Sequence, residues 1–150
     1  MRAVVQRVSH AQVSINDQIH CKIKAGVLIL LGIEEGDNFN DIEWLTSKIS
    51  QLRIFSDQNG QMNHSIIDRD GEILVVSQFT LFAKTKKGNR PSFTQAARPQ
   101  IAIPIYNDFI NQLSIKSNRR VYSGVFGADM QVQLTNDGPV TILIDTKNKE

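Results

Sequence analysis

Alternating apolar and polar residues, in runs separated by turn-forming residues, constrain this chain to a fold rich in antiparallel β-strands. Residues 11–15 and 19–23 alternate on either side of Asn16-Asp17, which predicts an amphipathic hairpin. Residues 130–134 and 140–144 repeat this pattern near the C-terminal end. The segment between these two later runs contains Asn, Asp and Gly, so the pattern predicts a second hairpin there.

The remaining apolar patterns predict buried strands and a helix. Residues 27–31 are apolar throughout, which predicts a strand covered on both faces, and residues 73–76 predict another buried strand. Helical spacing predicts a helix of about three turns over residues 42–52. Asn40 and Glu43 have the spacing of a capping box and are expected to begin this helix.

A second helix is expected to open at Pro104, and residues 147–150 are expected to fray. The patterns thus predict about seven or eight strands and two principal helices. This combination indicates a single α+β domain over residues 1–150, with a mainly antiparallel sheet curled toward a β-barrel.

Composition indicates an ordinary globular protein. The chain has 150 residues, 41% of them hydrophobic, which suffices for one domain with its own core. No apolar run is long enough to span a bilayer, and the N-terminal residues lack the pattern of a signal peptide. Cys21 is the single cysteine, so an intramolecular disulfide is excluded. We therefore expect a cytoplasmic protein without a membrane partner.

Positive charge is concentrated in the second half of the chain, although the net charge is only +2. Between residues 84 and 120 Asp108 is the one acid, against eight basic residues. The basic residues are Lys84, Lys86, Lys87, Arg90, Arg98, Lys116, Arg119 and Arg120. Such a segment is typical either of a contact with a polyanion or of a solvated lysine-rich surface.

The sequence contains no pattern for a metal or a nucleotide cofactor. His10, His20 and His64 do not have the spacing of metal ligands, and no cysteine pair accompanies them. No Walker loop or GxGxxG motif is present. We therefore expect neither a metal nor a cofactor.

The Gly138-Pro139 step is unusual for a hairpin turn. Its proline removes a backbone donor where the returning strand is expected to begin pairing. It also permits a cis peptide bond, which is rare outside X-Pro. Two interpretations stand: a proline that merely opens a strand, or a turn that directs carbonyl oxygens at a ligand.

The residues Ser77-Gln78-Phe79-Thr80 follow the second buried strand, and strand ends commonly carry functional groups. They offer hydroxyls, an amide and backbone N–H groups that can stabilise an oxyanion. They are not part of a GxSxG elbow, so a catalytic triad has no support. The alternative is that polar residues simply end the strand.

The two segments, in this order, resemble the D-aminoacyl-tRNA deacylases over essentially the whole chain. The same likeness extends to residues 1–8, 87–93, 124–128 and 130–132. It implies a homodimer whose two active sites lie at the interface and bind the 3′ aminoacyl-adenosine of tRNA, without a cofactor. The residues that it assigns to catalysis are Ser77, Gln78, Phe79 and Thr80, and those that it assigns to substrate binding are Gly138, Pro139, Phe126, Met130 and Arg7.

The resemblance further implies hydrolysis of the ester that joins a D-amino acid to tRNA. Glycine mischarged onto alanine tRNA is implied as a second substrate. Gly138-Pro139 would be cis and enter the partner's site, where its carbonyls exclude L-side chains, and Arg7 would help to hold the partner's loop. Attack by water aided by the ribose 2′-OH, and a role for Thr80 as nucleophile or positioning hydroxyl, both remain open. The loop at residues 84–90 is expected to contact tRNA phosphates.

Two rival functions remain. A relative that hydrolyses L-alanyl-tRNA has a trans Gly-Pro step and carries Pro and Ala at the positions of Ser77 and Phe79 here, so this chain matches the D-specific pattern. A non-catalytic RNA-binding dimer would use the basic segment alone.

Overall fold

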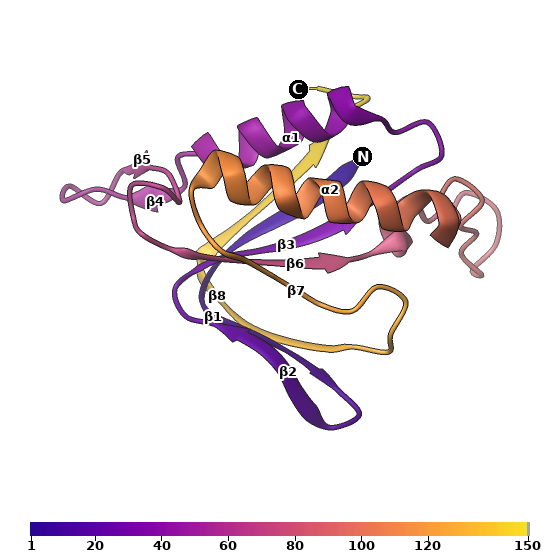
Figure 1. The fold of residues 1–150 in the computed structure, drawn as a ribbon, viewed down its shortest axis with the longest axis horizontal. Coiled ribbons are helices and arrows are strands. Elements are labelled where there is room, and N and C mark those ends of the chain that lie inside the picture. Colours follow the sequence, from indigo (N-terminus) through magenta and orange to yellow (C-terminus); the bar gives the residue numbers. More distant parts are fainter. Residues whose placement is uncertain (150) are drawn as a thin grey trace.

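The computed structural model describes residues 1–149, which form two helices over a curled sheet (Figure 1). The helices are α1 (Phe39–Gln51) and α2 (Pro99–Ser117), and a short 3₁₀ helix, η1, spans Phe79–Phe82. The strands are β1 (Arg2–Ile15), β2 (Gln18–Ile23), β3 (Gly26–Gly32), β4 (Phe55–Ser56), β5 (Met62–His64), β6 (Glu72–Ser77), β7 (Val121–Ser123) and β8 (Gln131–Asp145). The prediction of an α+β domain with a mainly antiparallel, curled sheet is confirmed.

The main sheet has the order β2-β1-β3-β6-β7, and β8 pairs with β1. The long strand β1 pairs antiparallel with β2, β3 and β8. By contrast, β6 runs parallel to both of its neighbours, β3 and β7. The parallel pairing of β6 with β3 brings the C-terminal ends of the two strands together, where Ser77 pairs with Leu31.

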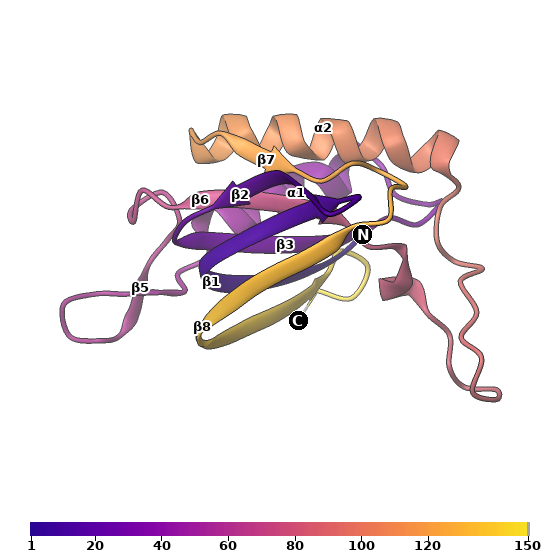
Figure 2. The same ribbon diagram turned by 90° about the horizontal axis from the view of Figure 1, so that it is seen from below.

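The central strands are buried on both faces, as their apolar sequences predict. Val27 and Ile29 of β3 belong to the core cluster that packs against α1 and α2. Leu28 of β3 and Leu74 of β6 belong to a second cluster, which the curled sheet encloses. Figure 1 shows both helices above the strands, and Figure 2 shows β8 on the side of the sheet away from α2. Strand β6 is therefore packed against apolar side chains on both of its faces.

The second predicted hairpin is wrong, because β8 does not reverse at the Gly-Pro step. Residues 131–136 and 141–145 both pair with β1, so β8 is one long strand. Between the pairs Gln6–Thr141 and Val8–Asn136, residues 137–140 lie opposite the single residue Arg7. The segment is thus a bulge of four residues against one, and Figure 1 shows β8 bending there. The Gly138–Pro139 peptide bond is cis.

Both helices begin earlier than predicted. The capping box of α1 uses Asn38 and Asp41, because the Asn38 side chain accepts the N–H of Asn40 and Asp41 Oδ2 accepts the N–H of Asn38. The predicted Asn40 cap lies inside the helix. Helix α2 begins at Pro99, which suits a first-turn position, and Pro104 lies within the helix.

The C-terminal segment is tied down where fraying was predicted. Lys147 Nζ donates to Asp41 Oδ1 at 2.9 Å and to Oδ2 at 2.8 Å. Burial acts to raise the pKa of Asp41, but the hydrogen bonds from Lys147 and Thr146 outweigh it and lower that pKa. The part of this expectation that concerns Glu150 lies outside the described residues. No helix in residues 1–149 is long and apolar enough to cross a membrane.

Candidate active site

The end of β6 turns directly into η1, and this junction exposes two backbone donors. The N–H of Gln78 donates to Leu31 O at 2.8 Å, so it continues the ladder between β6 and β3. The next two N–H groups, of Phe79 and Thr80, begin η1 and donate to no acceptor in residues 1–149. The backbone N–H of Gln78 is therefore occupied, whereas the N–H groups of Phe79 and Thr80 are free to bind an oxyanion.

A cleft of about 300 Å³ opens beside this junction. Five of the residues assigned to the site line it: Ser77, Gln78, Phe79, Phe126 and Met130. The first three come from β6 and η1, and the other two come from the segment between β7 and β8. Two segments about 50 residues apart in the chain thus meet at the place where the sequence pattern predicted a site.

Helix α2 holds the far wall of the cleft in place. The Tyr106 hydroxyl donates to Val75 O at 2.9 Å, which fastens the helix to β6. Burial raises the pKa of Tyr106 above its ordinary range, so the hydroxyl keeps its proton and acts as a donor. Its ring meets Phe126 edge-on, with centroids 5.7 Å apart. This contact positions Phe126 at the cleft wall.

Thr80 lies at the edge of the site and not among the residues that line the cleft. It lines a neighbouring groove with Arg2 and Leu143. Its hydroxyl accepts a hydrogen bond from the Gln78 side-chain amide. Within residues 1–149, no imidazole, carboxylate or amine is bonded to that hydroxyl. Thr80 therefore lacks the adjacent base that activates a hydroxyl nucleophile.

The Gly-Pro bulge is held by two side chains of its own chain. The Asn136 amide oxygen accepts the N–H of Val140 at 2.7 Å, and its Nδ2 donates to Thr141 Oγ1 at 2.9 Å. Arg7 Nε donates to Asp137 O at 2.8 Å, and Arg7 Nη1 donates to Ile54 O at 2.6 Å. The structure thus places Arg7 on the bulge of the same chain, and its assigned contact with a partner's loop stays a prediction.

The bulge does not reach the cleft of its own chain. Arg7, opposite the bulge, pairs with Val27, whereas Ser77 pairs with Leu31. Val27 and Leu31 are four positions apart on β3, a distance of roughly 13 Å along the strand. In Figure 1 the bend of β8 lies at the opposite side of the sheet from the arrowhead of β6. Gly138 and Pro139 are exposed, so the bulge is accessible from outside this chain.

Other residues that line the cleft were not predicted from the sequence. Asp129 is the one ionisable residue among those that line it. Ala97, just before α2, and Ala102, in the first turn of α2, shape its wall. Asp129 follows directly on residues 124–128, which resemble the family, and this position could have indicated it. The two alanines have no distinguishing pattern. Residues 1–149 contain no group of three or more His, Cys, Asp or Glu placed to hold a metal.

Comparison with known proteins agrees with this geometry. The sequence pattern described as D-Tyr-tRNA(Tyr) deacylase matches residues 4–145. Proteins named D-aminoacyl-tRNA deacylase are 63% identical over 150 residues in Porphyromonas gingivalis and 60% identical over 152 residues in Bacteroides fragilis. Each alignment covers 100% of both chains.

Two solved structures share the fold. One, named c-Myc DNA Unwinding Element Binding Protein, superposes with a TM-score of 0.90 at 41% identity and covers 97% of this chain and 98% of its own. The other, a probable eukaryotic D-amino acid tRNA deacylase, has a TM-score of 0.84 at 17% identity, covers 95% and 97%, and supports the fold alone. With a family pattern matched over nearly its whole length and relatives about 60% identical throughout, the chain belongs to the D-Tyr-tRNA(Tyr) deacylase family, and the prediction of an enzyme of this family is confirmed.

Proposed function

We propose that the cleft hydrolyses the ester that joins a D-amino acid to the 3′-terminal adenosine of tRNA, in the cytoplasm. The observation that carries this proposal is the convergence of Ser77, Gln78 and Phe79 with Phe126 and Met130 around one cleft. Both the family and the named relatives agree with the reaction.

The reaction needs only modest catalysis by the protein, because an aminoacyl ester is already activated. Water attacks the carbonyl carbon, and the negative charge that develops on the carbonyl oxygen needs hydrogen-bond donors. The N–H groups of Phe79 and Thr80 are the donors without an acceptor at this edge of the cleft. The ribose 2′-OH of the substrate positions the water, so the reaction does not depend on Asp129, the one ionisable residue that lines the cleft.

We propose further that the active protein is a homodimer in which the Gly138-Pro139 bulge enters the partner's cleft. Its exposure, and its distance from the cleft of its own chain, support this arrangement. Two carbonyls that bind the α-amine there would leave no room for an L-side chain. Selection then depends on exclusion and not on recognition of the side chain. Glycine, including glycine on alanine tRNA, has no Cβ and would be admitted.

A comparison of substrates tests this function. Purified protein is expected to deacylate D-Tyr-tRNA faster than L-Tyr-tRNA by at least about 100-fold, and also to deacylate Gly-tRNA. Release of free amino acid and recovery of uncharged tRNA are measured for each substrate. Preference for L-Ala-tRNA would support the L-alanyl rival, and no hydrolysis of any ester would support a non-catalytic RNA-binding dimer. Tight selectivity for one D-side chain would contradict the proposal that the site selects by excluding L-side chains.

Thr80→Ala distinguishes the two mechanisms that the sequence left open. Because no base is bonded to the Thr80 hydroxyl, the variant is expected to retain turnover within about tenfold of the wild type, the effect of one lost hydrogen bond. Single-turnover rates with D-Tyr-tRNA measure this, and Thr80→Ser is the control that restores the hydroxyl. A loss of about 10⁴-fold or more in Thr80→Ala would instead identify a nucleophile.

A further inference from the structure

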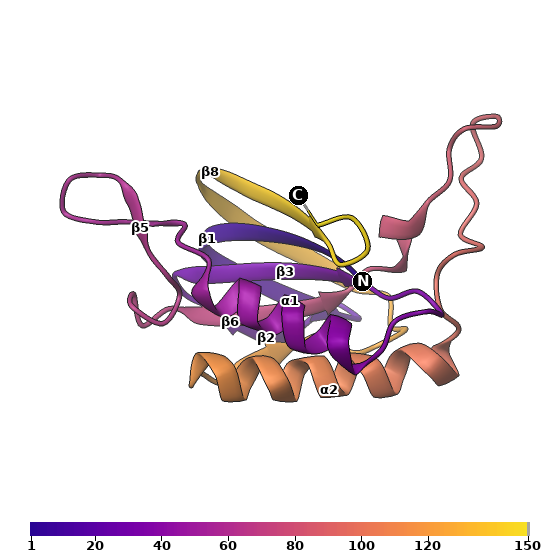
Figure 3. The ribbon, with the colours of Figure 1, turned by 90° about the horizontal axis from the view of Figure 1, so that it is seen from above.

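The segment at residues 84–98, here called the basic loop, leaves the body of the molecule at the rim of the cleft. The end of the loop is joined to the residue that follows β3, because Ala97 N–H donates to Ile33 O at 2.9 Å. Ala97 also lines the cleft. Two hydrogen bonds between Lys84 and Ser92, of 2.7 and 3.1 Å, close the loop. Figure 3 shows it projecting well beyond η1 and the end of α2. The loop is thus fixed at its base to the site.

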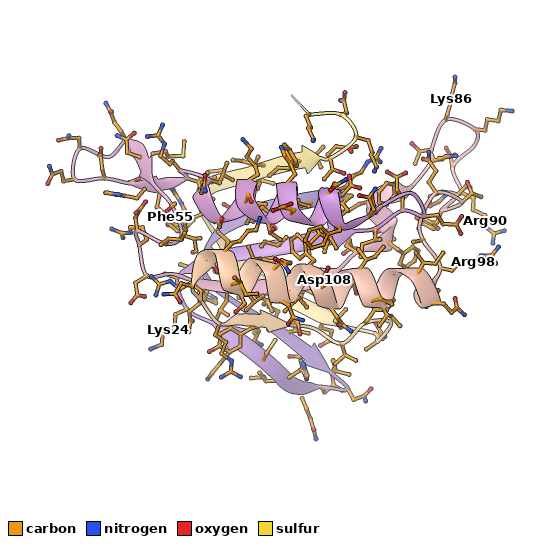
Figure 4. All side chains as sticks on the ribbon, turned by 45° about the horizontal axis from the view of Figure 1, so that its top comes forward. Lys24, Phe55, Lys86, Arg90, Arg98 and Asp108 are labelled. Carbon is orange, nitrogen blue, oxygen red and sulfur yellow. The ribbon has the colours of Figure 1, made fainter. Side chains whose placement is uncertain are left out.

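The charges on the basic loop are exposed and largely uncompensated. Lys86, Lys87 and Arg90 are exposed and form no ion pair within residues 1–149. Arg98 has a side chain that is 82% exposed, and its one carboxylate neighbour, Glu35, is 3.8 Å away. Figure 4 shows Lys86, Arg90 and Arg98 together at one end of the molecule. These side chains present a positive surface next to the cleft.

An aromatic pair lies between this positive surface and the cleft. Phe79, which lines the cleft, is 58% exposed. Phe93 of the basic loop meets it edge-to-face, with ring centroids 5.0 Å apart and an interplanar angle of 76°. An exposed phenyl ring costs free energy in water unless a partner covers it. Exposed rings beside basic side chains are the combination that binds single-stranded nucleic acid, through stacked bases and neutralised phosphates.

We propose that the Phe79–Phe93 pair and the basic loop form a track for the unpaired nucleotides that precede the terminal adenosine of tRNA. With the adenosine ester in the cleft, the next bases stack on the aromatic pair, and Lys86 and Arg90 contact the phosphates. Stacking requires bases that are free of a duplex, and the 3′ end of tRNA is single-stranded. The track rests on the proposed function and extends it to the body of the substrate.

Two substrates that differ only in the RNA separate the track from the cleft. D-Tyr-tRNA carries the full 3′ end, whereas the D-tyrosyl ester of adenosine carries no phosphate. Phe93→Leu is expected to lower kcat/KM on D-Tyr-tRNA by about tenfold and to leave the adenosine ester within about twofold. The double variant K86A/R90A should reduce the salt dependence of kcat/KM on tRNA, by a slope of about 0.7 for each lost phosphate contact.

Lys24→Ala is the matched control, since Lys24 is an exposed lysine at the opposite end of the molecule (Figure 4). This variant should leave kcat/KM unchanged for both substrates. Equal losses on both substrates for Phe93→Leu would overturn the track, because the residue would then act through the cleft. Unchanged kinetics on tRNA in all loop variants would overturn it as well.

A binding measurement tests the track independently of hydrolysis. An RNA hairpin with an unpaired CCA end is expected to bind more tightly than the same hairpin with a blunt end, and K86A/R90A should abolish the difference. Equal affinity for the two hairpins in the wild type would contradict the track even if hydrolysis is observed. Absence of hydrolysis with this difference intact would contradict the proposed function alone.

Discussion

Replacing Gly138 with alanine is expected to lower kcat/KM for D-Tyr-tRNA by about 100-fold, the effect of a displacement of about 1 Å at a site. Gly138 has a φ of +141°, which side chains rarely adopt. An added Cβ would lie 2.8 Å from Val140 Cγ2 and 2.9 Å from Arg7 Nη2. Either the bulge or the Arg7 guanidinium, which holds the carbonyl of Asp137, must therefore shift.

The control for this variant is Gly60→Ala. Gly60 also has a positive φ, of +78°, but nothing lies within 4 Å of its added Cβ. It is part of the turn between β4 and β5, away from both the cleft and the bulge. Gly60→Ala is expected to lower stability by about 1 kcal/mol and leave kcat/KM unchanged. Full activity in Gly138→Ala, with thermal unfolding like that of the wild type, would show that the bulge plays no part in the reaction.

Replacing Gly26 with alanine is expected to lower the free energy of unfolding by about 4 kcal/mol, at the upper end for a single substitution. An added Cβ at Gly26 would lie 1.9 Å from Glu72 O and 2.7 Å from Glu72 N. These are backbone atoms of the paired strand, so no rotation of a side chain relieves the contact. Strands β3 and β6 must separate at the end where their parallel pairing begins.

Gly36→Ala is the matched control, because Gly36 is exposed and nothing lies within 4 Å of its added Cβ. Its free energy of unfolding should stay within about 0.5 kcal/mol of the wild type. Urea unfolding followed by the far-UV signal measures both variants under the same conditions. A loss below about 1 kcal/mol in Gly26→Ala would mean that the sheet accommodates the methyl group, contrary to this expectation.

Local signals in the sequence sufficed for much of the fold. The Asn16-Asp17 turn and the strand at residues 27–31 were predictable because turn chemistry and uninterrupted apolar runs depend on neighbouring residues. The fold class followed from their combination. The predicted start of α1 was two residues late. Asn38–Asp41 and Asn40–Glu43 have the same capping spacing, and tertiary contacts select the first pair.

The pairing of β8 could not be read from its own residues. Asn136, Asp137 and Gly138 suit a hairpin and a bulge equally well. The choice is made by β1, whose Gln6 and Val8 pair on either side of the bulge from more than 100 residues away.

The candidate site was predictable to a similar degree. Ser77 to Phe79 stand at a strand end, which is a local signal, and they line the cleft. Phe126 and Met130 were placed there by family resemblance, and the structure brings them to the same cleft. Ala97 could not have been predicted, because its place depends on the long-range hydrogen bond that joins the segment before α2 to Ile33. The position of Arg7 on its own bulge likewise depends on the long-range pairing of β1 with β8.

The bulge in β8 also separates pairing with β1 from the presentation of the Gly-Pro loop, which a strand without a bulge would have to combine. Residues 131–136 and residues 141–145 each pair with β1, and the four residues between them have no ladder partner on β1. An insertion or deletion within those four residues would change the reach of the loop without moving a core side chain to the other face of the sheet. The length of this segment is therefore decoupled from the register of the strands that flank it.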